Sequence, residues 1–338
     1  MTATAKQLIK LLIRIIITTA LLIWVFSQID FKQFLQTTKS ARWQFLLTVW
    51  LVTIILFWIR SIKMRLILKK QGCLISTKTI FGATAATSLY SMILPGILST
   101  GVKWYILKKG TGKSSNILCS MIYNQWLIMT IMMIFGLAAL MFTSPESLSI
   151  SNTTSQWFFP VVCGILLIVI IAVSLLLLNS RTGGKITKGI AVILRPWPEK
   201  IKQKGLQMLN QIATFQTAGA GFHLKITTIS IIDTLIGGVV IYILSARAAN
   251  VNAPVGTFVW LCALIYILGR VPVSIANLGV REAMLVVLLA PYGVEKPQAL
   301  LMSMILFSAL IVMAVIGAGY QIFWTVAAKK SEPPINNA

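Results

Sequence analysis

Several long stretches of this chain contain no charged residue, and the longest are residues 114–145, 147–180 and 297–328. A helix needs about 20 apolar residues to cross the hydrocarbon core of a bilayer. Because 57% of the residues are hydrophobic and only 11% are charged, polar side chains are too scarce to cover a soluble protein. The sequence therefore predicts an all-α polytopic membrane protein. Six segments are long and apolar enough to be full transmembrane helices: approximately residues 8–27, 43–62, 117–142, 157–178, 224–246 and 299–327.

The charges are strongly unbalanced, with 30 lysines and arginines against 7 acids and a formal net charge of +23. In a soluble domain such a surplus would suggest a nucleic-acid partner. Here the cations lie between the apolar runs, which is typical of loops drawn to an anionic membrane surface. We therefore expect no nucleic-acid partner.

Two apolar regions are interrupted and do not fit a simple span. Residues 79–102 contain Pro95-Gly96, and residues 256–290 contain Val271-Pro272 followed by Gly279. Proline removes a backbone hydrogen bond, and the freed polar groups cannot face lipid. Both regions are therefore predicted to be re-entrant or broken helices inside the protein.

The distribution of cations also predicts the orientation. If the N-terminus is cytoplasmic and each broken region returns to the side that it entered from, most of the 30 cations fall on the cytoplasmic side. If the first broken region crossed the membrane instead, the cation clusters at residues 60–78 and 103–113 would face opposite sides. We predict a multi-pass protein of the plasma (cell inner) membrane with both termini in the cytoplasm.

The two broken regions occupy matching places in two halves of the chain. Leu94-Pro95 followed by Gly101-Val102-Lys103 parallels Val271-Pro272 followed by Gly279-Val280-Arg281, and a long span follows each. The predicted orientation makes the two halves inverted. Inverted halves with interrupted segments are typical of transporters that bind their substrate between those segments.

These patterns predict a single membrane domain over residues 1–330 and a disordered tail at 331–338. Repeat 1 covers about residues 43–142 and repeat 2 about residues 224–327, and a cytoplasmic linker at about 179–223 joins them.

The linker contains one predicted helix, which begins after Pro198. Apolar residues recur there at helical spacing while the lysines fall elsewhere, so the helix is amphipathic. It either lies on the inner membrane surface or packs on the bundle. The apolar positions are Ile201, Met208, Leu209, Ile212 and Phe215.

The usual metal ligands are scarce. Cys73, Cys119, Cys163 and Cys262 share no C-x-x-C spacing, and the one histidine is His223. Because zinc sites need several such ligands close together, we expect packing cysteines, a polar histidine at a span boundary, and neither a metal nor another cofactor.

Asp233 is the clearest ionisable residue at membrane depth, about 12 Å into its span at 1.5 Å per residue. Such a charge is costly there and faces a cavity or a partner. Asp233 is therefore either a proton or counter-ion site on a transport path, or a structural partner for Arg270, Arg60 or another cation.

The most specific short motif in the sequence is Gly279-Val280-Arg281-Glu282. If Gly279 caps the following helix, Glu282 is the third helical residue, where its carboxylate satisfies free backbone N–H groups. Arg281 beside such a helix N-terminus is a natural contact for a phosphate or another anion. Lys103, after Gly101 in the first half, is suited to the same role, or is an interfacial lysine without function.

Further polar residues near the breaks would line a cavity or form an interfacial aromatic belt. They are Tyr90, Trp104, Tyr105, Asn124, Gln125, Trp126 and Asn277. The predicted substrate-binding residues are Arg281, Glu282, Arg270, Lys103, Asp233 and Asn277, and the structural motif residues are Pro95, Gly96, Gly101, Pro272 and Gly279.

These motifs resemble those of the lysylphosphatidylglycerol synthase transmembrane region, the flippase-like membrane domain of multiple peptide resistance factors. The resemblance rests on Leu94-Pro95-Gly96 to Gly101, on Pro272-Val273-Ser274 to Glu282, on Tyr292-Gly293-Val294, and on Gly317 in the last span. The chain departs from the family pattern before Arg281-Glu282, where a glycine pair is usual and this chain has Asn277-Leu278-Gly279, and at Lys103, where arginine is usual.

The resemblance implies a domain that moves lipids across the bilayer. Bifunctional members carry aminoacylated phosphatidylglycerol, and some stand-alone relatives belong to hopanoid or isoprenoid-linked glycolipid pathways. We expect an anionic phospholipid or isoprenoid-linked lipid as the substrate. The alternatives are a membrane-embedded transferase acting on a lipid head group, which the scattered acids disfavour, and an accessory subunit of a lipid or cell-envelope pathway. Both a homodimer and an envelope-biosynthesis partner stay open.

The orientation predicts a difference in chemical access. A cysteine introduced at Ser151 should react with an impermeant thiol reagent added outside cells, whereas one introduced at Gln203 should not react until the membrane is permeabilised. The reverse labelling pattern would overturn the orientation.

Overall fold

The computed structural model describes residues 23, 27, 31–92, 96–143, 158–178, 183–184, 199–270 and 277–331. Across these residues the chain is helical and contains no strand. Pro95, Pro272, the tail beyond residue 331 and almost all of the predicted first span lie outside the described residues.

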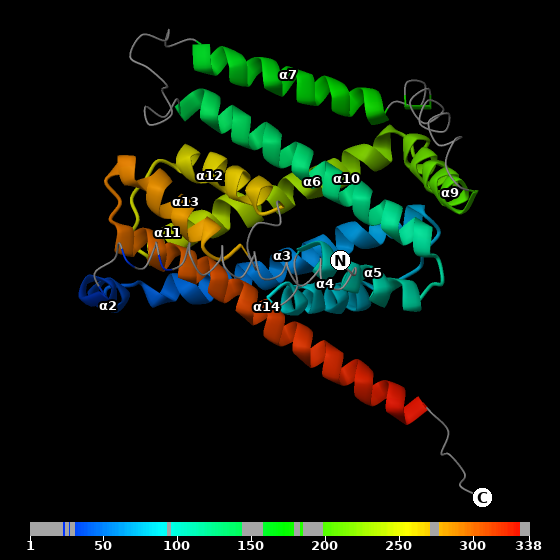
Figure 1. The fold of residues 1–338 in the computed structure, drawn as a ribbon, viewed down its shortest axis with the longest axis horizontal. Helices are drawn as coiled ribbons and strands as arrows, with labels where there is room; N and C mark the ends of the chain where they lie inside the picture. Colours follow the sequence, from blue (N-terminus) through cyan, green and yellow to red (C-terminus); the bar gives the residue numbers. More distant parts are fainter. Residues whose placement is uncertain are drawn as a thin grey trace, which may run out of the picture.

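Five helices in the described part of the chain are long and apolar enough to cross a membrane. Four of them are α3 (Trp43–Lys70), α6 (Ser114–Thr143), α7 (Phe158–Leu178) and α14 (Lys296–Ser331). The fifth is a continuous helix built from α10 (Ala220–Thr234), a π-helix (Leu235–Val240) and α11 (Ile241–Ala248). They match five of the six predicted spans and confirm an all-α polytopic membrane protein (Figure 1).

The first interrupted region forms a helical hairpin. α4 (Thr77–Ser91) and α5 (Gly96–Lys109) pack side by side. The two ends of the hairpin meet, because Lys113 Nζ donates a hydrogen bond of 3.0 Å to the carbonyl oxygen of Gly72. The chain therefore returns to the end of the bundle that it entered from, which is the path that a re-entrant hairpin would take.

The second interrupted region contains α12 (Val255–Leu268) and α13 (Val280–Leu289), which contact one another. Asn277 and Gly279 adopt positive φ angles of 59° and 83°, so the chain turns sharply just before α13. The side chain of Asn277 packs so closely on Gly269 that a Cβ at that glycine would collide with it. The two ends of the break therefore lie side by side. The two interrupted regions lie toward opposite ends of the bundle (Figure 1).

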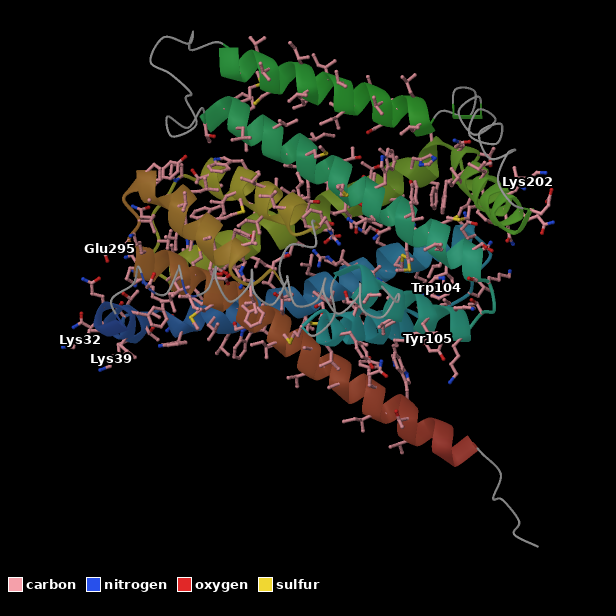
Figure 2. The ribbon with its side chains drawn as sticks, in the orientation of Figure 1. Lys32, Lys39, Trp104, Tyr105, Lys202 and Glu295 are labelled. Carbon is pink, nitrogen blue, oxygen red and sulfur yellow. The ribbon has the colours of Figure 1, made fainter. Side chains whose placement is uncertain are left out.

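Labelled charged side chains lie near the two ends of the bundle (Figure 2). Lys32 and Lys39 of α2 (Phe31–Lys39) lie at the same end as Glu295, and Lys202 lies at the opposite end. This separation agrees with the predicted placement of these lysines on opposite sides of the membrane.

The linker helix is α9 (Glu199–Gln216), as predicted. Leu209 and Phe215 are buried, and Gln71 Nε2 of α3 donates a hydrogen bond of 2.8 Å to the carbonyl oxygen of Gln211. The helix therefore packs on the bundle, which was one of its two predicted placements.

The four cysteines and the histidine have packing or hydrogen-bond contacts within the protein. All four cysteines are buried and free. Cys73 lies in the turn before α4, where burial raises the pKa of its thiol although nearby Lys113 lowers it, so the thiol stays protonated at neutral pH. His223 lies in the first turn of α10, where its Nδ1 is 2.9 Å from Tyr123 Oη and its Nε2 donates to the carbonyl of Phe215. It is the boundary residue that the sequence predicted.

The closest helix contact that positions the first hairpin lies between α4 and α14. A Cβ at Gly317 of α14 would lie 2.7 Å from the backbone nitrogen of Ala86 and would collide with the carbonyl of Ala85. Gly319, two residues further on, has nothing within 4 Å of such a Cβ. Only the first glycine is therefore required by the packing.

We expect Gly317→Ala to destabilise the purified protein by about 1–3 kcal/mol, because the added methyl group forces the backbones of α4 and α14 apart. Gly319→Ala is the matched control, and it should be neutral or stabilising by up to about 1 kcal/mol because alanine favours helix. Thermal unfolding in detergent measures both. Equal unfolding temperatures for the two variants would contradict this packing.

Candidate functional site

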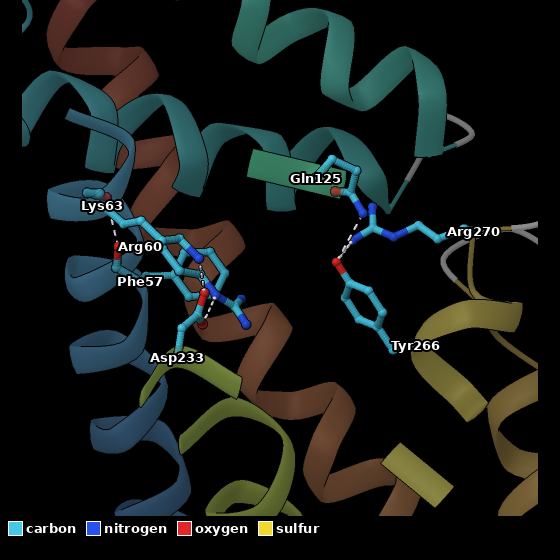
Figure 3. A network of polar contacts seen from close by, with 8 residues as sticks. Phe57, Arg60, Lys63, Gln125, Asp233, Tyr266 and Arg270 are labelled. Atoms are coloured by element: carbon cyan, nitrogen blue, oxygen red, sulfur yellow. Dashed lines mark hydrogen bonds and ion pairs between the residues drawn. The ribbon is translucent and has the colours of Figure 1, made fainter. Parts of the chain in front are cut away.

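A buried carboxylate and two cations form the first charged centre of the bundle. Asp233 of α10 accepts a hydrogen bond of 2.7 Å from Arg60 Nε at Oδ1 and one of 2.6 Å from Lys63 Nζ at Oδ2 (Figure 3). The side chains of Asp233 and Lys63 are only 2% and 1% exposed, whereas that of Arg60 is 32% exposed. Pairing with Arg60 was one of the alternatives that the sequence left open, and the structure shows it. The second partner, Lys63, is a cation that the sequence analysis did not name.

Helix geometry explains how one carboxylate meets two cations. Arg60 and Lys63 lie three residues apart, so both face the same neighbour. A π-helix begins at Leu235, directly after α10, and its residue Gly237 lies against α3. A Cβ at Gly237 would lie 3.0 Å from Arg60 Nη2, so the missing side chain leaves room for the guanidinium. Short π-helical stretches occur frequently at functional sites.

Lys103 of α5 adds a third cation to this centre. It is half-buried and lies within electrostatic range of Arg60, Lys63 and Asp233. Lys103 makes no hydrogen bond or ion pair with any residue that the structure describes. Three cations against one carboxylate leave a surplus of two positive charges inside the bundle.

A second polar group faces this centre. Tyr266 Oη of α12 accepts hydrogen bonds of 2.6 Å from Arg270 Nη2 and 3.1 Å from Gln125 Nε2 of α6. The guanidinium of Arg270 also lies 4.5 Å from the centroid of the Tyr266 ring. In Figure 3 the guanidinium of Arg60 points toward this group, and Arg60 is within electrostatic range of Tyr266. Tyr266 was not among the residues predicted from the sequence.

The Gly279-Val280-Arg281-Glu282 segment forms a separate and closed network. Glu282 accepts a hydrogen bond of 2.7 Å from the backbone nitrogen of Gly279, which confirms its predicted capping role. Ser303 of α14 accepts a hydrogen bond of 2.7 Å from Arg281 Nε and donates one of 2.7 Å to Glu282 Oε1. Arg281 Nη2 also donates to Glu282 Oε1 at 2.5 Å, and all three side chains are buried. One cation and one anion therefore neutralise each other here.

The remaining motif residues differ in how tightly they are placed. Gly96 is the first residue of α5, and Gly101 on the same helix is exposed with nothing within 4 Å of a Cβ placed on it. Asn277 helps to close the second break through its contact with Gly269. Lys103 and Asp233 lie together, Arg270 lies with Tyr266, and Arg281 lies with Glu282. Among the described residues, no group of three or more His, Cys, Asp or Glu side chains could hold a metal ion.

A comparison with protein families matches residues 11–319 of the chain to the family described as the lysylphosphatidylglycerol synthase TM region. The chain belongs to this family. No curated protein and no solved structure matches the chain at a significant level.

The Asp233 ion pair generates a stability prediction. We expect Asp233→Leu to destabilise the protein by about 3–5 kcal/mol, because it leaves Lys63 buried without a partner carboxylate. Lys63→Met combined with Asp233→Leu should recover part of this loss, since an apolar pair replaces the ion pair. Thermal unfolding in detergent compares the two variants.

The control breaks an exposed pair of the same kind. Glu199→Gln removes the 2.9 Å ion pair with Lys202, whose side chains are 69% and 33% exposed, and should change stability by about 1 kcal/mol at most. If Asp233→Leu had as small an effect as this control, the Asp233 pair would not be the structural tie described above.

Proposed function

We propose that this membrane protein is a lipid transporter of the flippase type, which moves an anionic phospholipid or isoprenoid-linked lipid across the cytoplasmic membrane. The observation that carries the proposal is the surplus of positive charge formed by Arg60, Lys63 and Lys103 around Asp233 inside the bundle. Uncompensated charge at membrane depth is costly and usually faces a cavity or a substrate pathway. An anionic head group would neutralise it.

The two helical hairpins support a transport path. A head group needs polar surface at membrane depth, and interrupted helices supply it where they line a cavity inside the protein. The first hairpin presents Lys103, and the second break begins at Arg270. The placement of the hairpins toward opposite ends of the bundle supports an inverted repeat with both termini in the cytoplasm.

The proposed substrate contacts differ in their availability. Lys103 has no hydrogen-bond partner among the described residues, and Arg270 is exposed. Arg281, Glu282 and Asn277 would contribute mainly by holding the second break in shape, because their contacts are within the protein. Asp233 would balance the charge of the cations around the head group or bind a coupling proton, whereas both oxygens of Glu282 are engaged by Gly279, Arg281 and Ser303.

Arg270→Ala should slow transbilayer movement of a labelled anionic phospholipid by about tenfold or more, equal to about 1.4 kcal/mol, because it removes a cation exposed at the second break. The measurement is reconstitution of the purified chain in liposomes followed by reduction of outer-leaflet label. Arg247→Ala is the matched control, since Arg247 is an exposed arginine in the last turn of α11 and should be dispensable.

Other outcomes of this experiment would assign a different function. No lipid movement by the wild type, or movement unaffected by Arg270→Ala, would contradict the transporter. Formation of a modified lipid from a labelled donor, lost on changing Asp233 or Glu282, would indicate a transferase. Activity that requires a second envelope protein would indicate an accessory subunit.

A further inference from the structure

The first charged centre has unused hydrogen-bond donors as well as unused charge. Asp233 engages Nε of Arg60 and one hydrogen of the Lys63 ammonium group. The outer nitrogens of Arg60 make no hydrogen bond with a described residue, and Lys103 offers three further donors. These donors come from two elements, α3 and α5, and Lys103 lies within electrostatic range of Arg60 and Lys63.

Two buried hydroxyls lie on the same helix as Asp233, at positions that share its face. Ser230 and Thr234 are 0% and 3% exposed, and neither hydroxyl has a hydrogen-bond partner among the described residues. With Asp233 and Gly237 they follow the spacing that places residues on one face of a helix, and this face contacts α3. Buried hydroxyls without partners are rare in folded proteins and suggest a ligand or an ordered water.

We propose that the Arg60–Lys63–Lys103 cluster binds a phosphate monoester head group, a dianion, in preference to a phosphate diester or an aminoacylated lipid. This proposal rests on the proposed function for the membrane lipid as the source of the phosphate. It goes further by naming the chemical class of the head group and the residues that select it.

Charge decides between the head groups. A phosphate monoester carries about −1.5 to −2 charges near neutral pH and has three terminal oxygens that accept hydrogen bonds, so it neutralises the surplus of two positive charges. A phosphate diester carries a single negative charge, so one of the two surplus positive charges stays unneutralised. A lysyl ester of phosphatidylglycerol brings two ammonium groups to one phosphate, so it adds to the positive charge instead of neutralising it.

The experiment compares lipids that differ only in the head group. Purified full-length protein in a neutral detergent is equilibrated with equimolar dioleoylphosphatidate, dioleoylphosphatidylglycerol and lysyl-dioleoylphosphatidylglycerol, and native mass spectrometry counts the retained lipids. We expect about tenfold preference for phosphatidate over phosphatidylglycerol at pH 8, equal to about 1.4 kcal/mol. A polyprenyl monophosphate should be retained as well as phosphatidate.

Acidification tests whether the second charge matters. The second pKa of a phosphate monoester is about 6, so at pH 5 phosphatidate carries one charge like the diester and its preference should disappear. Among the described residues, the titratable groups near the site are Arg60 and Lys63 of α3, Lys103 of α5, Asp233 of α10, and Cys262 and Tyr266 of α12. Acid can only add protons to these groups, and the added positive charge would strengthen anion binding. A loss of preference at pH 5 would therefore come from protonation of the lipid phosphate.

The variants test whether the cluster is the site. Lys103→Ala should reduce the preference at least about fivefold, or about 1 kcal/mol, and Lys103→Arg should keep it. Lys109→Ala is the control, because Lys109 is an exposed lysine on the same helix and should leave binding unchanged. Equal effects of Lys103→Ala and Lys109→Ala would overturn the assignment.

Two further outcomes would overturn the proposal. One is equal or stronger retention of phosphatidylglycerol or its lysyl ester at pH 8, which would still leave lipid transport intact. The other is full displacement of phosphatidate by an equal concentration of inorganic phosphate, which would assign the site to free phosphate. Selective retention by the wild type without lipid movement in liposomes would support this site and contradict the proposed transport.

Discussion

The arrangement of the bundle depends on the pairing of Asp233 with Arg60 and Lys63. An ion pair in a low-dielectric interior is stable only when its geometry is good and its partners are complete, so it fixes the rotation of α3 against α10. Gly237 lies beside this contact, where a Cβ would come within 3.0 Å of Arg60 Nη2. Because α3 leads directly into the first hairpin, the ion pair also determines where Lys103 can lie.

The two interrupted regions are held by different means. The first hairpin is positioned by backbone-to-backbone packing at Gly317 and by the hydrogen bond from Lys113 that joins its ends. The second break is held by polar side chains, because Asn277 packs on Gly269 and Glu282 caps α13. Because neither of these contacts uses Lys103, the first hairpin leaves this side chain available to another partner. A break held by an ion pair uses its charges for its own structure.

Local properties of the sequence predicted most of the fold. Span length, hydropathy and the proline and glycine interruptions are readable within a window of a few turns, and so is the capping role of Glu282. The partners in the site could not be found in this way, because Lys63 lies 170 residues from Asp233 and Ser303 lies 21 residues from Glu282. Lys63 also belongs to a cation cluster that was interpreted as an orientation signal. The one available sequence signal was the three-residue spacing of Arg60 and Lys63, which places both cations on one helix face. This spacing predicts an ion-pair site only when a carboxylate is known to lie opposite that face.

The matching motifs of the two halves show why similarity in sequence does not predict equal roles. Lys103 and Arg281 occupy corresponding positions after a broken segment, yet Arg281 donates to Glu282 and Ser303 while Lys103 has no described partner. If both cations were paired, the surplus of positive charge around Asp233 would fall from two charges to one. If neither were paired, both halves would carry the free-energy cost of an unpaired charge inside the bundle. Arg281 is therefore neutralised within its own half, whereas Lys103 adds to the positive charge around Asp233. In the predicted orientation the first hairpin opens toward the cytoplasm, so under the proposed function a lipid from the inner leaflet would meet Lys103 first.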